Sequence, residues 1–94
     1  MTKIIDIKFE PGAVAATPAA MHKIDPNYAL AALTQHLQGK WGTCDPQDWK
    51  ANDEALKNGG RLLSVYPLPN EAGDFWIITE HDRSVTTILL PSDY

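Results

Sequence analysis

The sequence changes character at Arg61, and this change limits the fold more than any other feature. Before it, three segments begin with a helix N-cap residue followed by proline, which suits the first helical position. These starts are Thr17-Pro18, Asp25-Pro26 and Asp45-Pro46. After it, residues 61–68, 74–80 and 84–91 are rich in β-branched and aromatic residues, as strands are. Helices followed by hairpins predict an α+β fold, with an antiparallel sheet of three to four strands and two to three helices packed against it.

The second and third helical segments each carry a side that is predicted to face the core. In residues 25–39 this side is formed by Ala29, Leu30, Leu33 and Leu37. In residues 45–59 it is formed by Trp49, Asn52, Ala55 and Leu56. Gly39 and Gly59 follow these stripes and are typical of helix ends. The first segment, from Thr17, predicts only a short helical turn.

Alternation predicts the strands. Ile5, Ile7 and Phe9 share one face of residues 3–9, which predicts a further, half-buried strand at the amino terminus. The segments after Arg61 are joined by a loose turn at 69–73 and a tight turn near 81–83, so an antiparallel meander is expected. Both faces of its last two strands are largely apolar, which predicts cover on both sides and a charged turn, residues 80–84, in water.

The length and net charge of the chain limit the number of domains and the classes of partner that can be expected. Ninety-four residues predict a single domain, 1–94. Eight basic against twelve acidic residues give a net charge of −4, and the basic residues are scattered, so nucleic-acid binding is not expected and a protein partner with basic character is favoured. Cys44 is the single cysteine, so no internal disulfide forms and a cytoplasmic location is expected. Residues 1–12 are too charged for a signal peptide, and no membrane span is predicted.

Several chemistries are disfavoured by spacing. "DPNY" at 25–28 looks superficially like a methyltransferase loop, but the chain has no G-x-G-x-x-G for a nucleotide cofactor, and helix capping explains Asp25 and Pro26. The three histidines and Cys44 form no pair at metal-ligand spacing, so neither a metal nor a cofactor is predicted. Nothing close to Cys44 in sequence activates it as a nucleophile, except the helix start that it precedes.

The polar cluster in "TEHDRSVTT", residues 79–87, is the candidate catalytic group. Glu80 or His81 as a general base and Arg83 as a phosphate-binding group, with Thr87 donating a hydrogen bond, would suit a small metal-independent ribonuclease. Such enzymes usually carry a basic RNA-binding face, and this chain is acidic. The other interpretation of the cluster is a polar turn followed by ordinary strand threonines.

Candidate binding residues are Trp41, Trp49 and Arg83. A tryptophan in a short connector, as Trp41 is, either plugs the end of the core or anchors an interface, since Trp is frequent in both places. Trp49 allows the same two interpretations. A short sheet also leaves strand edges that must be covered or paired, and the sequence leaves a homodimer through such an edge open.

Four blocks of the chain resemble a group of small plasmid-related proteins, found on plasmids and integrated elements and in some cases labelled restriction endonuclease methylation subunits. The blocks are "GAVAATPAAM", "HLQGKWG", "NDEALKNGGRLLSVYPL" and "WIITEHDRSVTTILLPSDY". The resemblance spans Gly12 to Tyr94, and Lys40 departs from the Asp that is common in the group. It implies a mobile-element context and no particular activity.

Two functions follow as hypotheses. The preferred one is a non-enzymatic protein-binding module of a plasmid or integrated element, which acts on a host defence or regulatory protein; the acidic charge and the three tryptophans favour it. The alternative is the ribonuclease-like enzyme that uses the hairpin at 80–87.

Overall fold

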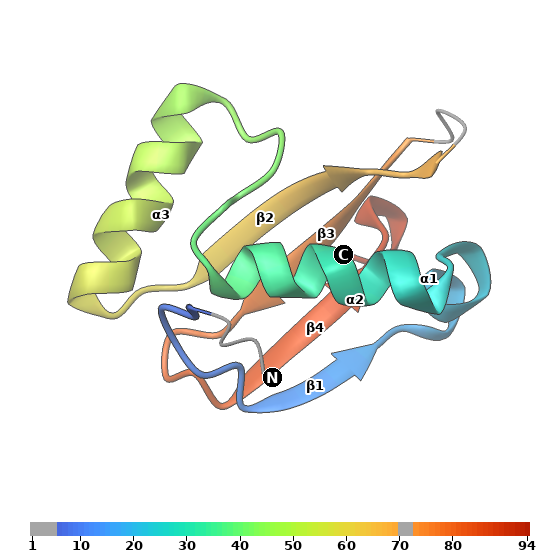
Figure 1. The fold of residues 1–94 in the computed structure, drawn as a ribbon, viewed down its shortest axis with the longest axis horizontal. Coiled ribbons are helices and arrows are strands. Elements are labelled where there is room, and N and C mark those ends of the chain that lie inside the picture. The colour runs from blue at the N-terminus through green and yellow to red at the C-terminus, as the bar shows by residue number, and fades with distance from the viewer. Residues whose placement is uncertain (1–5, 70–72) are drawn as a thin grey trace, which may run out of the picture.

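A computed structural model describes residues 6–69 and 73–94. The elements are β1 (Ala13–Ala16), α1 (Pro18–Lys23), α2 (Pro26–Leu37), α3 (Pro46–Asn58), β2 (Leu62–Pro67), β3 (Asp74–Thr79), β4 (Val85–Leu89) and the 3₁₀ turn η2 (Pro91–Asp93). The four strands form one sheet in the order β1-β4-β3-β2 (Figure 1). The α+β class is confirmed, and so is the antiparallel meander β2-β3-β4. The sheet as a whole is mixed, because β1 runs parallel to β4.

The strand predicted at 3–9 is wrong where the structure describes it: residues 6–9 form no strand, and residues 3–5 lie outside the described residues. The alternation has another cause. Phe9 packs edge-on against the His36 ring, with centroids 5.4 Å apart. The N–H of Lys8 donates to the carbonyl of Leu37 at 2.7 Å, so this segment covers the end of α2. The first strand is instead β1, an Ala-rich stretch with no strand pattern in its sequence.

The three helix starts are confirmed. Thr17 Oγ1 accepts from the N–H of Ala20 at 3.1 Å, and Asp45 Oδ1 accepts from that of Asp48 at 2.8 Å. Asp25 caps α2 in the same way, and each helix has its proline in the first turn. These caps satisfy backbone donors that a helix leaves unpaired. The left-handed Gly59, with φ of 79°, ends α3 as expected.

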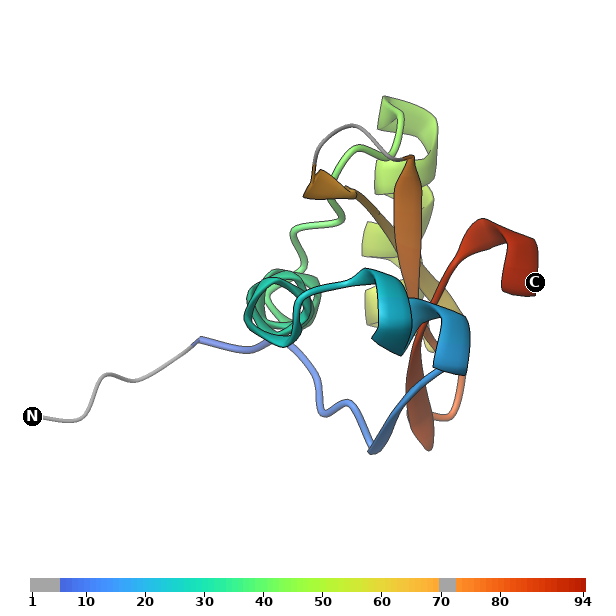
Figure 2. The ribbon, with the colours of Figure 1, turned by 90° about the vertical axis from the view of Figure 1, so that its right-hand side faces the viewer.

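Helix α2 covers one face of the sheet, as Figure 2 shows, and α1 packs against β4. The core on this face includes Ile24, which follows α1, Ala32 from α2, and Phe75, Ile77 and Ile88 from the strands. The predicted stripe of α2 is wrong in one position, since Leu30 is 61% exposed. Ala32 and His36 point into the core instead, which rotates the buried side of α2. A buried histidine is tolerated there because strand hydroxyls bond its ring.

The opposite face of the sheet is covered by the end of the chain. Figure 2 shows the C-terminal turn on the side of the sheet away from α2. The ring of Tyr94 packs edge-on against Trp76, with centroids 5.6 Å apart. On the same face Ile78 is 2% exposed. The central strands are therefore fully covered on the helix side, whereas the second face is covered only in part: Ile78 is buried there, but Trp76 and Thr87 are half-buried.

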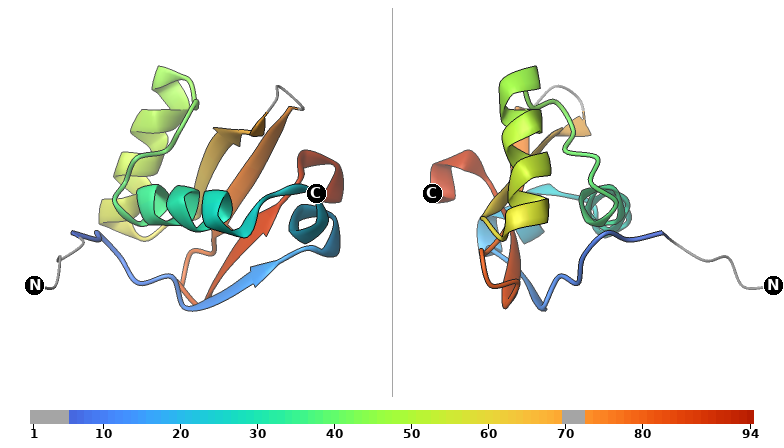
Figure 3. Two further views of the ribbon diagram at one scale, coloured as in Figure 1. Left: turned by 45° about the vertical axis from the view of Figure 1, so that its right-hand side comes forward. Right: turned by 90° about the vertical axis from the view of Figure 1, so that its left-hand side faces the viewer.

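The free edge of β2 is closed by side chains and by a connector. The amide of Asn52, from α3, donates to the Leu63 carbonyl at 2.8 Å and accepts from the Leu63 N–H at 3.1 Å. Further along, Val65 bonds the backbone of residues 41 and 43, and the hydroxyl of Tyr28 donates to the carbonyl of Pro67. Figure 3 shows α3 beside this edge. The groups through which β2 could pair with another strand are thus occupied.

Candidate functional site

The turn between β3 and β4 forms a polar hairpin tip. The N–H of Glu80 donates to the carbonyl of Val85 at 3.1 Å, and the N–H of Arg83 donates back to the carbonyl of Glu80 at 2.9 Å. Asp82 Oδ1 accepts from the N–H of Ser84 at 3.0 Å, and contacts with Ser84 lower the pKa of the Asp82 carboxyl. Arg83 has a φ of 61°, the left-handed conformation that closes the turn.

Arg83 uses its guanidinium to hold the turn against the end of α3. Its N–H groups donate to the backbone carbonyls of Ala55, Gly60, Glu80 and His81. Its charge lies over the ring of Phe9, 5.6 Å from the centroid. A cation at the carboxyl end of a helix is favourable because carbonyl dipoles gather there. The guanidinium is therefore engaged by the fold, and these donors are not free for a phosphate.

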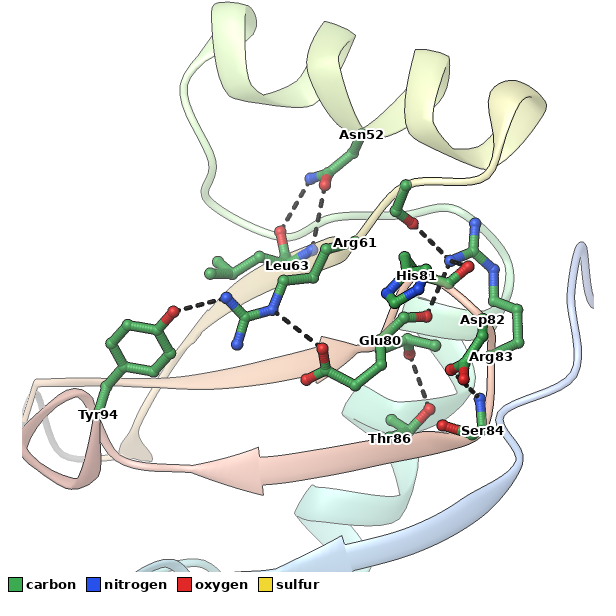
Figure 4. Close-up of polar contacts among 12 residues, drawn as sticks. Asn52, Arg61, Leu63, Glu80, His81, Asp82, Arg83, Ser84, Thr86 and Tyr94 are labelled. Carbon is green, nitrogen blue, oxygen red and sulfur yellow. Dashed lines mark hydrogen bonds and ion pairs between the residues drawn. The ribbon is translucent and has the colours of Figure 1, made fainter.

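The other candidate catalytic residues lie in different surroundings (Figure 4). Glu80 is directed toward Arg61, with 3.6 Å between Oε1 and Nε, and Arg61 also donates to the hydroxyl of Tyr94. His81 is exposed at the tip. Thr87 is half-buried opposite Ile78, in the middle of the sheet. The side chains of these four candidate residues do not converge on one point: they are Glu80, His81, Arg83 and Thr87.

Trp41 lies in the core. Its side chain is 0% exposed, and Nε1 donates to Asp53 Oδ1 at 2.9 Å. Its ring packs against those of Phe9 and His36. This is the plug of the first interpretation, and Trp41 offers no surface to a partner.

Trp49 is the candidate binding residue that remains accessible. It is half-buried on α3 and, with Cys44, Pro46, Lys50 and Asp53, lines an open hollow of about 370 Å³. A second hollow of about 210 Å³ lies on the other side of Cys44, between α3 and β2. Burial raises the pKa of the Cys44 thiol, which disfavours the thiolate. The hollow beside Trp49 therefore offers an aromatic wall and two charged groups, and the thiol is not activated.

A buried polar network that no sequence pattern predicts links α2 to three strands. The carbonyl of Pro11 can only accept, so Thr86 donates its hydroxyl proton to it, at 2.7 Å. Thr86 then accepts from Thr79 at 2.7 Å, and Thr79 accepts from Nε2 of His36 at 2.9 Å. Nδ1 of His36 is left unprotonated and accepts from Ser64, at 2.6 Å. The directions are consistent with a neutral imidazole throughout.

The network is structural. A serine hydroxyl beside an imidazole is the contact that activates nucleophiles in hydrolases. Here, however, His36, Ser64, Thr79 and Thr86 are each 0% exposed, so no substrate reaches the hydroxyl in this conformation. Burial and, to a smaller extent, the charge of Arg83 lower the pKa of His36 from 6.5 to about 3. The ring is therefore a neutral hydrogen-bonding hub at ordinary pH.

Within residues 6–69 and 73–94, no three His, Cys, Asp or Glu side chains are placed to hold a metal ion. Over the same residues, no helix has the length and apolar character needed to cross a membrane.

Comparisons of the chain with models of protein families, with curated proteins and with solved structures found no match.

Proposed function

We propose that this protein is a non-enzymatic protein-binding module of a plasmid or integrated element, and that it contacts a host defence or regulatory protein through Trp49. The position of Trp49 carries the proposal: a half-buried indole on the wall of an open hollow of about 370 Å³. Tryptophans in such positions are over-represented among residues that dominate binding energy. The mobile-element context rests on the resemblance of the four sequence blocks.

The charges around Trp49 specify the chemistry of the partner. Asp45 and Asp53 lie one helical turn before and after it, and therefore flank the indole. Over α3 and its cap, four acidic residues (Asp45, Asp48, Asp53 and Glu54) outnumber two lysines (Lys50 and Lys57). A partner with an apolar side chain for the hollow and Lys or Arg on either side is complementary to this surface. Such an association weakens as salt is added.

The ribonuclease-like alternative has less support. It needs a base, a cation and hydroxyls around one reacting atom. Arg83 is bonded to four carbonyls, Glu80 pairs with Arg61, and Thr87 lies in the middle of a strand.

Affinity capture from a natural host tests the proposal. The wild type is expected to retain a basic protein, and Trp49→Ala is expected to lose it. Glu54→Lys, an exposed charge reversal on α3, is expected to weaken retention and its dependence on salt. Ile7→Ala, an exposed apolar residue before β1, is the control and is expected to retain the partner. Thermal unfolding of each variant shows that the fold is kept.

Two results would count against the proposal. One is a retained protein that is indifferent to both Trp49→Ala and Glu54→Lys. The other is cleavage of RNA by the purified protein that disappears with His81→Ala, an exposed substitution that leaves the fold intact.

A further inference from the structure

The two edges of the sheet are treated differently by the fold. The β2 edge is closed, as described above, whereas β1 forms the opposite edge (Figure 1). Ala13 and Thr17 donate their N–H groups to the carbonyls of Ser84 and Ile88, both at 3.0 Å. Because strand residues alternate in direction, the N–H and C=O groups of Val14 and Ala16 point away from β4. In the described part of the chain, no group pairs with them.

Apart from its shortness, this edge lacks the usual protection against pairing. Natural edge strands are very short or carry a charge, a proline or a bulge. The four residues of β1, by contrast, are Ala, Val, Ala and Ala, and Val14 is 50% exposed. Met21 on α1 and Leu30 on α2 are 70% and 61% exposed. Apolar side chains and free backbone groups therefore occur together on this side of the molecule.

An apolar hollow adjoins the edge on the helix-covered face. It has a volume of about 160 Å³ and is lined by Ala16 from β1, Ala20, Met21 and Ile24 from the α1 region, Ala29 from α2 and Ile88 from β4. Val14 and Ala16 are in register with Thr86 and Ile88, so both side chains stand on this face. The branched side chain of Val14 projects from the edge, and the methyl group of Ala16 lies at the mouth of the hollow.

We propose that a second copy of this chain occupies the β1 edge, with the two β1 strands antiparallel about a twofold axis. With the axis at Ala15, Val14 of each copy exchanges both backbone hydrogen bonds with Ala16 of the other. Opposed side chains in such a pair are close neighbours. Val14 of each copy therefore rests on Ala16 of the other and fills the hollow beside it. The strand is complementary to itself, which is the argument for a second copy over an unrelated strand.

The distribution of charge also favours a second copy of the chain as the partner of the β1 edge. Each copy carries a net charge of −4, so two copies meet most favourably where neither contributes charge. Neither β1 nor the hollow has a charged side chain. A stable dimer commonly buries about 800 Å² on each partner. A four-residue edge is short for that, so Met21 and Leu30 must add to the contact, and the dimer is expected to be reversible.

The dimer adds to the proposed function and does not depend on it. In the strand order β1-β4-β3-β2, the Trp49 helix lies beside the edge opposite β1. The two Trp49 surfaces of a dimer would then lie at its two far ends, which suits a partner with two binding segments.

Sedimentation of the purified full-length protein, from low micromolar to several hundred micromolar concentration, tests the dimer. The wild type is expected to pass reversibly from monomer to dimer. Val14→Lys places a charge at the contact, and Val14→Pro removes an outward N–H while leaving the bonds to β4 intact; each is expected to raise the dissociation constant at least tenfold. Val14→Thr keeps shape and backbone and should still dimerise. Ala51→Lys, exposed on α3, is the charge control and should dimerise like the wild type.

Cross-linking tests the register. In a Cys44→Ser background, Ala15→Cys brings two thiols across the axis at a separation that suits a disulfide, and a mild oxidant should join the copies. Val14→Cys should cross-link far less, because Val14 faces Ala16 of the other copy.

The outcomes separate the two proposals. A protein that stays monomeric at all concentrations, or a dimer indifferent to Val14→Lys and Val14→Pro, overturns the dimer. So does a monomer whose Val14 edge binds a strand of another protein. In each case capture through Trp49 would leave the proposed function standing. A dimer that is lost with Val14→Lys stands even if no partner is captured through Trp49.

Discussion

Nε2 of His36 and the hydroxyl of Thr79 form a buried hydrogen bond of 2.9 Å that ties helix α2 to the central strand β3. The other ring nitrogen is bonded to Ser64 on β2. A single imidazole thus fixes the position of the helix over two neighbouring strands. The uncharged ring is strongly favoured in this position, because burial and the charge of Arg83 both oppose a second proton on the imidazole.

Stability is therefore expected to fall in mild acid. The pKa of His36 is about 3 in the folded state and about 6.5 when the chain is unfolded. Above pH 6.5 both states are neutral and the contribution of His36 is complete. Below it, the unfolded chain binds a proton that the folded chain refuses, so the free energy of unfolding falls by about 1.4 kcal/mol per pH unit. Urea unfolding from about pH 6.5 to about pH 5 should show a loss of about 2 kcal/mol. His36→Gln should remove most of this slope, and an unchanged slope would contradict the assignment.

Neighbouring threonines on β4 provide a matched pair of substitutions. Thr86 lies in the buried network, whereas Thr87 is half-buried on the other face. Thr86→Val keeps the shape but leaves the Thr79 hydroxyl proton without an acceptor and the Pro11 carbonyl without this donor, which should cost about 1–3 kcal/mol. Thr87→Val should change the free energy of unfolding by no more than about 0.5 kcal/mol. Equal effects in urea unfolding would show that the network contributes nothing.

Alanine substitutions at Gly42 and Gly59 would distinguish the cost of backbone strain from the cost of a steric collision. Both have a φ of 79°. Beside Gly59 a Cβ would meet nothing within 4 Å, so Gly59→Ala should cost about 1 kcal/mol, from strain alone. At Gly42 a Cβ would collide with the carbonyl of Val65, which accepts from Thr43. Gly42→Ala should therefore cost at least about 3 kcal/mol, since it also displaces the connector from β2. Similar melting temperatures for the two variants would contradict this.

Arg83 is expected to matter for stability and not for chemistry. Loss of its bonds to the end of α3 should cost about 1.5–3 kcal/mol in either Arg83→Ala or Arg83→Gly. The glycine variant should be the more stable of the two by about 1 kcal/mol, because the φ of 61° suits glycine. His81→Ala, at the exposed tip of the same turn, is the control and should be neutral. Denaturant unfolding measures all three. A glycine variant no more stable than the alanine one would argue against strain at this position.

Features with local causes could be predicted from the sequence. The caps at Thr17, Asp25 and Asp45 act within one helical turn, and the strands after Arg61 show in their own composition. β1 could not be predicted in this way, because its pairing partner β4 lies about seventy residues away and its alanines carry no pattern. The same distance hides the role of His36, whose partners Ser64 and Thr79 lie on other elements.

The candidate site was also predictable only in part. The composition of residues 80–84 predicts a turn. It does not predict that Arg83 points at the end of α3, because only the fold brings the turn and this helix together. For Trp41 the complete burial of the side chain decides between the two interpretations, and this burial depends on the packing of the indole against Phe9 and His36, which are distant in sequence.

Because Asn52, Thr43 and Tyr28 occupy the β2 side, the sheet has only one end at which it can grow. A ribbon that lengthens without limit needs two such ends in every unit, as amyloid fibrils do. Whatever strand joins β1 finds no second vacancy on the far side of the molecule. The Asn52 amide, by occupying β2, thus helps to stop the sheet from growing after one strand has been added at β1.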